Sequence, residues 1–148
     1  MNYSTIKEIK DFCNALESQP DWRDVVEGVA HAIDEFTVDG VRFINTHAID
    51  DIQQDELRAD LYVLGCFNAG FLAEILELDK DCIEAVQKAE AFEGLGKLII
   101  AMDKLEDLQA EYARLDGYGH HFNHYDFSEA ELQVGPRLFH VFDQHECF

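Results

Sequence analysis

Residues 61–78 read LYVLGCFNAGFLAEILEL and carry no charge before Glu74, in a chain whose formal net charge is -20. Apolar side chains would lie on nearly every side of a helix formed by this stretch, which indicates burial all round. Glu74, Glu77 and Asn68 argue against a membrane span. We therefore predict a mainly α protein of the α+β class, in which five or six helices form a bundle around a buried central helix.

Two details of this central helix are open to test. Gly65 and Gly70 lack side chains and are suited to places where other helices approach closely. Phe71 is expected to be a core residue, so that Phe71→Ala would cost about 3–5 kcal/mol of stability.

Apolar residues recur at helical spacing on both sides of this segment. We expect helices over residues 3–18, 21–36, 46–59 and 81–115. Ser4 or Thr5 is expected to cap the first helix, and Asp21 to begin the second. Gly94 and Gly96 are expected to break or kink the last, because glycine costs about 1 kcal/mol in a helix interior. No repeat or linker divides the chain, which predicts one globular domain over residues 1–148.

Two short β elements are also expected. Asp39-Gly40 is a turn signal, and the residues after it, VRFI, suggest a short strand. Near the C-terminus, residues 122–127 and 138–142 are expected to pair as strands around the turn at Gly135-Pro136. The sequence thus predicts a small C-terminal β element beside the helices.

The charge is the strongest functional signal. The chain has 31 Asp and Glu residues against 11 Lys and Arg residues, and a pI near 4.4. Such a surface repels phosphate backbones, so we expect no direct nucleic-acid binding. It attracts basic protein surfaces, unless the acidity serves only solubility. The candidate partner-binding residues flank the central helix and are Asp50, Asp51, Asp55, Glu56, Asp60, Glu77, Asp81 and Glu84.

A histidine cluster occupies residues 117–126, GYGHHFNHYD, with His140 and His145 nearby in the sequence. An extended conformation is favoured, which places His120 and His124 on one side of a strand; a helix would make them a metal pair at i, i+4. No ligand set has a recognised spacing, so we predict no tightly bound metal and no cofactor. His120, His124 and His140 remain the candidates for an alternative, metal-binding function.

A second alternative is a helix-turn-helix regulator. The core positions of such a motif would be Ala73, Ile75, Leu76, Leu78, Ile83 and Val86. A DNA reader needs basic or amide side chains on its second helix. This helix is acidic, and Gln87 is its one suitable base reader, so we favour ordinary helix packing.

Four cysteines, Cys13, Cys66, Cys82 and Cys147, form no CxxC pair, which favours reduced thiols in a cytosol. Charged residues interrupt the N-terminal apolar run, and no membrane-spanning segment is visible, so we expect a cytoplasmic protein with no membrane partner. The chain contains no Walker, Rossmann or GxSxG motif, and we expect a protein that is not an enzyme.

Three segments resemble small acidic proteins of phages and other mobile elements: VRFINTHAIDDIQQDELRADLYVLGCFNAGFLAEIL (41–76), IEAVQKAEAFEGLGKLI (83–99) and LDGYGHHFNHYDFSEAEL (115–132). The resemblance covers about the last two thirds of the chain and carries over no catalytic residue. It implies a protein that binds a basic surface of a host protein. Anti-CRISPR and antirestriction inhibitors include such acidic DNA mimics, so a counter-defence inhibitor is the function we expect.

Overall fold

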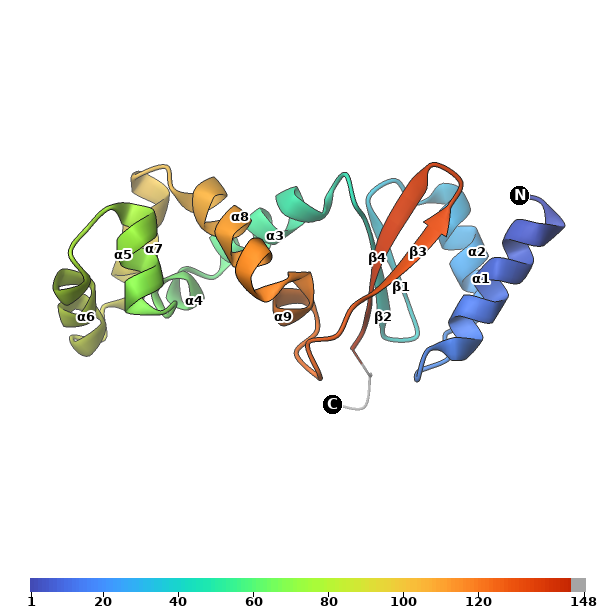
Figure 1. Cartoon of the computed structure of the whole chain (residues 1–148), viewed down its shortest axis with the longest axis horizontal. Helices are drawn as coiled ribbons and strands as arrows, with labels where there is room; N and C mark the ends of the chain where they lie inside the picture. Colours follow the sequence, from blue (N-terminus) through green and yellow to red (C-terminus); the bar gives the residue numbers. More distant parts are fainter. Residues whose placement is uncertain (145–148) are drawn as a thin grey trace. The chain divides into compact units, whose positions relative to one another are not determined.

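Residues 1–144 are described by the structure, a computed structural model that contains short helices and one four-stranded antiparallel sheet (Figure 1). The prediction of a mainly α protein with a small β element is therefore confirmed. The chain forms two compact units. The sheet unit comprises Met1–Ile49 and the chain from Asp116 onward, and the helical unit comprises Asp50–Leu115. That the whole chain behaves as a single domain stays a prediction.

The sheet is built from two hairpins that are far apart in the sequence. Asp39 and Gly40, both with positive φ, turn the first hairpin, and Gly135, with φ 59°, turns the second, as predicted. The inner strands of the two hairpins pair with each other, so that Ile44 lies opposite His140. In the order β1-β2-β4-β3, the strands are β1 (Glu35–Val38), β2 (Val41–Asn45), β4 (Arg137–Asp143) and β3 (Ala130–Val134).

Helices α1 (Tyr3–Ala15) and α2 (Trp22–His31) contribute to the core of the sheet unit, in which Ile9 and Val25 cluster with Phe43 and Val141. Alternate strand residues face opposite sides of a sheet. Phe142, one residue on from Val141, therefore faces the other side, where the Phe122 ring of α9 (Tyr118–Phe122) lies 5.1 Å from it. Helices thus cover both faces.

The N-terminal helices are shorter than predicted. Asn2, rather than Ser4 or Thr5, caps α1 by accepting a hydrogen bond from the Thr5 backbone N–H at 2.8 Å. Asp21 caps α2 as expected, accepting from the Arg23 N–H at 2.9 Å. The second helix ends at residue 31 instead of 36, because the chain then enters β1.

The predicted strand at residues 122–127 is wrong. Residues 118–122 are helical, and the strand that pairs with β4 across the turn at Gly135 is β3. A methyl group on Gly119 would lie 2.0 Å from the Phe127 carbonyl oxygen, so the chain folds back tightly on α9 after residue 122. The alternating aromatic residues that suggested a strand are divided between the core, at Phe122, and the surface, at Phe127.

The helical unit has its own core, which contains Leu57, Leu64, Leu72, Ile83, Ile99 and Leu108. No described helix has the length and apolar character needed to cross a membrane. The helices of this unit are α3 (Ile49–Ala59), α4 (Leu61–Gly65), α5 (Ala69–Leu76), α6 (Lys80–Lys88), α7 (Phe92–Ala101) and α8 (Leu105–Asp116).

Residues 61–78 form two helices, α4 and α5, instead of one. The Asn68 side chain accepts hydrogen bonds from the N–H groups of Gly70 at 2.9 Å and Phe71 at 3.2 Å, so it caps a new helix within the uncharged run. This run is also not buried all round, since Tyr62 is 56% and Val63 45% exposed.

Two glycines of this unit, Gly65 and Gly96, mark close packing between helices. A methyl group on Gly65 would lie 1.9 Å from the Phe92 carbonyl oxygen, which confirms the predicted close approach there. At Gly70 the first contact would be the neighbouring Asn68 side chain at 3.2 Å, so the same prediction is wrong for Gly70. The predicted break at Gly94 and Gly96 is also wrong, because both lie inside α7.

Candidate functional site

The first group of candidate acids lies on α3 and at the start of α4. Asp50, Asp51, Asp55 and Asp60 are exposed and Glu56 is half-buried. Glu56 has an internal contact, and so do three of the exposed acids. Asp50 accepts a hydrogen bond from the Gln109 side chain at 2.8 Å, Asp55 pairs with Arg58 at 2.8 Å, and Asp60 caps α4 by accepting from the Val63 N–H at 3.2 Å. We call Asp51, Asp55 and Glu56 the α3 acids.

The second group surrounds the turn between α5 and α6. Glu77 is exposed and adopts a left-handed conformation, with φ 57°, at the end of α5. Asp81 is exposed in the first turn of α6, where a negative charge interacts favourably with the positive end of the helix dipole. Glu84 is half-buried, and its carboxylate lies 3.5 Å from the Lys80 ammonium group.

These two groups do not adjoin within the helical unit. Figure 1 shows α3 and α6 at opposite ends of this unit, with α4, α5 and α7 between them. The helical unit holds 16 of the 31 acidic residues and 6 of the 11 basic residues, so each unit carries half of the formal charge of -20. The acidity is therefore distributed, and the α3 acids are a local group within it.

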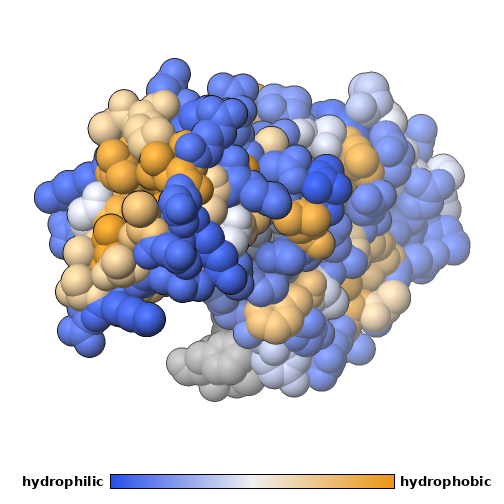
Figure 2. Space-filling view, turned by 60° about the vertical axis from the view of Figure 1, so that its left-hand side comes forward, coloured by the Kyte–Doolittle hydropathy of each residue, from blue (hydrophilic) through white to orange (hydrophobic). Residues whose placement is uncertain are grey.

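The surface is mostly hydrophilic on the face shown in Figure 2, with apolar residues gathered in separate areas. The ion pairs on α3 and α6, Arg58–Asp55 and Lys80–Glu84, join residues within one helix and are largely exposed. Exposed pairs of this kind contribute about 0–1 kcal/mol each. α3 carries four acids and one basic residue, Arg58, so the charge of this helix stays negative.

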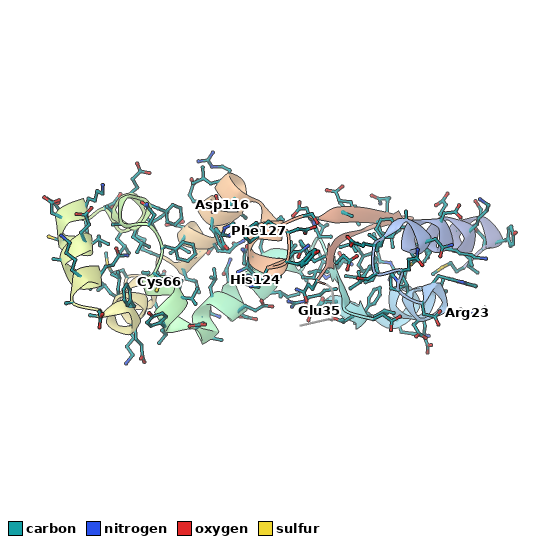
Figure 3. The ribbon with its side chains drawn as sticks, turned by 90° about the horizontal axis from the view of Figure 1, so that it is seen from below. Arg23, Glu35, Cys66, Asp116, His124 and Phe127 are labelled. Carbon is teal, nitrogen blue, oxygen red and sulfur yellow. The ribbon has the colours of Figure 1, made fainter. Side chains whose placement is uncertain are left out.

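The histidines divide between surface and core. His120 is exposed on α9 and stacks on the Phe127 ring at 4.8 Å, and His124 is exposed on the following loop (Figure 3). The expected extended conformation at these residues is wrong, and α9 ends before His124. Over residues 1–144, no three or more His, Cys, Asp or Glu side chains form a group that could hold a metal. His145 and Cys147 lie outside the described residues.

His140 is buried in the sheet unit. Its Nε2 lies 3.0 Å from the Thr46 hydroxyl, and its ring contacts the Tyr118 ring edge-on at 5.1 Å. These contacts indicate that His140 has a structural role, in the packing of β4 against α9 and the end of β2. They place it in a different environment from His120 and His124, which are exposed.

The helix-turn-helix pattern is a packed hairpin of α5 and α6. Leu76 and Ile83 are buried in the core, whereas Leu78 is 41% exposed. Gln87, the expected base reader, donates hydrogen bonds from its side chain to the carbonyl oxygens of Gly65 at 3.0 Å and Phe67 at 2.8 Å. It therefore ties α6 to the break between α4 and α5, which disfavours a role in reading bases.

A hollow of about 350 Å³ lies in the sheet unit, where α2 meets β1, and the sequence did not indicate it. Asp24 and Glu27 line it from the helix side. Helical spacing places Asp24 and Glu27 on one face of α2, because residues three apart share a helix face, but it does not show which strand lies opposite them.

Comparison with known proteins assigns no relative. No protein-family model matches the chain, and neither curated proteins nor solved structures give a significant match.

Proposed function

We propose that this protein is a non-enzymatic, acidic interaction protein that binds a basic surface of a host protein through the α3 acids. The supporting observation is that Asp51 and Asp55 are exposed and Glu56 is half-buried on one short helix, whose single basic residue is Arg58. Asp50 ties this helix to α8 through the Gln109 side chain, and Asp60, directly after the helix, caps α4.

The proposed mode of action is competition. A basic cleft that binds the phosphates of a nucleic acid also attracts exposed carboxylates. This protein and the nucleic acid would therefore exclude each other from the cleft. A phage-encoded counter-defence inhibitor of the anti-CRISPR or antirestriction type would act in this way. The resemblance to small acidic phage proteins supports this form of the proposal.

The test is binding to a partner isolated from the host lysate, with purified chain and purified partner, at about 50 mM and about 200 mM salt. We expect affinity to fall steeply with salt, and duplex DNA to displace the chain. The triple variant Asp51→Asn, Asp55→Asn, Glu56→Gln should weaken binding about tenfold or more, since each tenfold corresponds to about 1.4 kcal/mol. This variant leaves unchanged Asp50, which bonds to Gln109 on α8, and Asp60, which caps α4.

The matched control removes three charges elsewhere in the helical unit, by Glu74→Gln, Glu90→Gln and Glu106→Gln, at exposed positions. We expect this control to bind like the unmodified chain. Binding that is indifferent to salt and to the α3 substitutions, or that falls equally in both variants, would contradict the proposal. The exposed aromatic residues Tyr125 (49%) and Phe127 (55%) would then be the better candidate surface.

A further inference from the structure

The hollow in the sheet unit combines a rigid apolar wall with an acidic rim. Asp24, Glu27 and Gly28 line it from α2, and Phe36, Thr37 and Asp39 line it from β1 and the turn after it. The Phe36 ring is held on two sides. It stacks on Phe43 at 4.7 Å, and a methyl group on Gly28 would lie 2.4 Å from it, so the ring rests against the helix backbone.

The rim is negative and lacks a cation. Three of its side chains are carboxylates, and no Lys or Arg lines the hollow. Asp39 is fixed in place, because its carboxylate accepts a hydrogen bond from the Asp21 backbone N–H at 2.9 Å. Among the described residues, Asp24 and Glu27 have no hydrogen bond or ion pair, which distinguishes them from most of the acids on α3.

The nearest cation in the sequence is engaged elsewhere. Arg23 precedes Asp24 on α2 (Figure 3), and its guanidinium lies 4.8 Å from the centre of the Trp22 ring. Three carboxylates around one hollow repel one another, and a bound cation would relieve this repulsion. The hollow therefore offers an incoming cation both charge and an apolar surface.

We propose that this hollow binds the guanidinium group of an arginine side chain presented by a partner protein. The aliphatic part of arginine would lie along Phe36, as long cationic side chains do on apolar surfaces, while the head reaches the rim. A guanidinium has five N–H donors in a planar fork and can bond several carboxylates at once. A lysine ammonium is a compact, strongly hydrated charge, so it is less suited to contacting several carboxylates around the rim at once. The hollow lies in the sheet unit, so this binding does not depend on the α3 acids.

The experiment titrates the full chain, labelled with ¹⁵N, with arginine blocked at both ends as N-acetyl-arginine amide. We expect amide shifts to change at residues 24–28 and 36–39. Blocked lysine should bind about fivefold more weakly or worse, and blocked citrulline, which has the same shape without the charge, should give no shifts there. Equal affinity for lysine and arginine, or equal shifts with citrulline, would overturn the guanidinium assignment.

Two charge-matched variants test the location. Asp24→Asn with Glu27→Gln should weaken arginine binding about tenfold. Glu8→Gln with Glu131→Gln removes two exposed charges from the same unit and should leave binding unchanged. Shifts that spread over all acidic residues, or that persist in the first pair, would overturn the site. The dispersed spectrum of each variant shows whether it is folded. The triple variant of the α3 acids should bind arginine normally, so failure of this site and failure of the proposed function are distinguishable.

Discussion

Gly65 lies so close to Phe92 that a methyl group on Gly65 would come within 1.9 Å of the Phe92 carbonyl oxygen. The reverse arrangement occurs at the other end of the contact, where a methyl group on Gly96 would lie 2.1 Å from the Leu61 carbonyl oxygen. Helices α4 and α7 therefore pack backbone against backbone, with one glycine supplied by each helix. Backbone atoms cannot rotate away as a flexible side chain can, so these positions admit no side chain without a shift of a helix.

We therefore expect Gly65→Ala and Gly96→Ala each to lower the free energy of unfolding by about 1–3 kcal/mol or more, the usual range for overpacking. Chemical denaturation measures this change. Gly94→Ala is the control, because nothing lies within 4 Å of a methyl group there. Alanine should stabilise this exposed position of α7 by about 0.5–1 kcal/mol. Equal effects at Gly94 and Gly96 would show that α4 and α7 are not in contact.

The core of the helical unit gives a second prediction. Leu72 is fully buried, whereas Phe71 beside it is half-buried. Leu72→Ala should cost about 2–5 kcal/mol, the range for removing a packed leucine. Phe71→Ala should cost less than the 3–5 kcal/mol expected from the sequence, because part of its ring is already in water. Unfolding of both variants under the same conditions compares them, and a larger loss at Phe71 would refute the observed burial.

A third prediction concerns the loop after α9, which is held by the fully buried Asn123. Its side-chain N–H₂ donates to the Asp126 carboxylate and to the Ser128 carbonyl oxygen, both at 2.9 Å, and its oxygen accepts from the Tyr125 N–H at 3.1 Å. Asn123→Ala removes all of these bonds and should cost about 2–3 kcal/mol, since each contributes about 1 kcal/mol.

Hydrogen exchange distinguishes loss of this loop from general unfolding. In the Asn123→Ala variant, amides of residues 125–128 should exchange faster, while those of β2 and β4 keep their relative order of protection. Gln133→Ala is the control. Gln133 is exposed on β3, and its side chain donates a hydrogen bond to the carbonyl oxygen of Gly135, which is nearby in the sequence. Unchanged exchange at residues 125–128 would contradict the role of Asn123.

The fourth prediction concerns the cysteines. Burial, and then the Asp21 carboxylate, raises the pKa of the Cys13 thiol to about 11. Cys13 is buried, whereas Cys66 and Cys82 are exposed. A short pulse of iodoacetamide at pH 8 should therefore modify Cys66 and Cys82 well before Cys13, as read by peptide mass spectrometry. Rapid modification of Cys13 in folded protein would contradict its burial.

The same pKa shift has a consequence for stability. Above pH 9 the unfolded Cys13 thiol loses its proton, but the folded one keeps it until about pH 11. The unfolded state then binds fewer protons, so this residue lowers stability as pH rises from 9 to 11. The loss of stability between pH 9 and pH 11 should be smaller in the Cys13→Ala variant than in the unmodified protein. Denaturant unfolding of both proteins across this pH range measures the difference.

The sequence predicted elements better than their ends. The turns at Asp39-Gly40 and Gly135-Pro136 were correct, because turn residues with special backbone angles act locally. Helix ends were missed where the left-handed residue is not glycine, as at Glu90 and Asp103 between α6, α7 and α8. Gly96 was misread for the opposite reason. Its absent side chain serves the contact with Leu61, which is distant in the sequence and leaves no local signal.

The candidate site shows a similar division. That acids such as Asp51 and Asp55 lie on an exposed helix face follows from helical spacing alone. That Asp50 is bonded to Gln109, or that Gln87 is used to hold α6, depends on contacts between helices that no spacing reveals. The hollow beside Phe36 is formed by the packing of α2 against β1, which the sequence does not show, so the hollow could not be located from the sequence.

The connection of the two hairpins through the helical unit fixes an order of events during synthesis. Residues 50–115 are continuous, and their core can form as soon as they leave the ribosome. The sheet is different, since β2 must wait for β4, about ninety residues later, before Ile44 meets His140. Until then the inner edge of β2, with the apolar residues Val41 and Phe43, has no neighbouring strand on that side. Unpaired apolar edges promote aggregation. A nascent chain that stalls before residue 137 is therefore the form of this protein that most needs a chaperone.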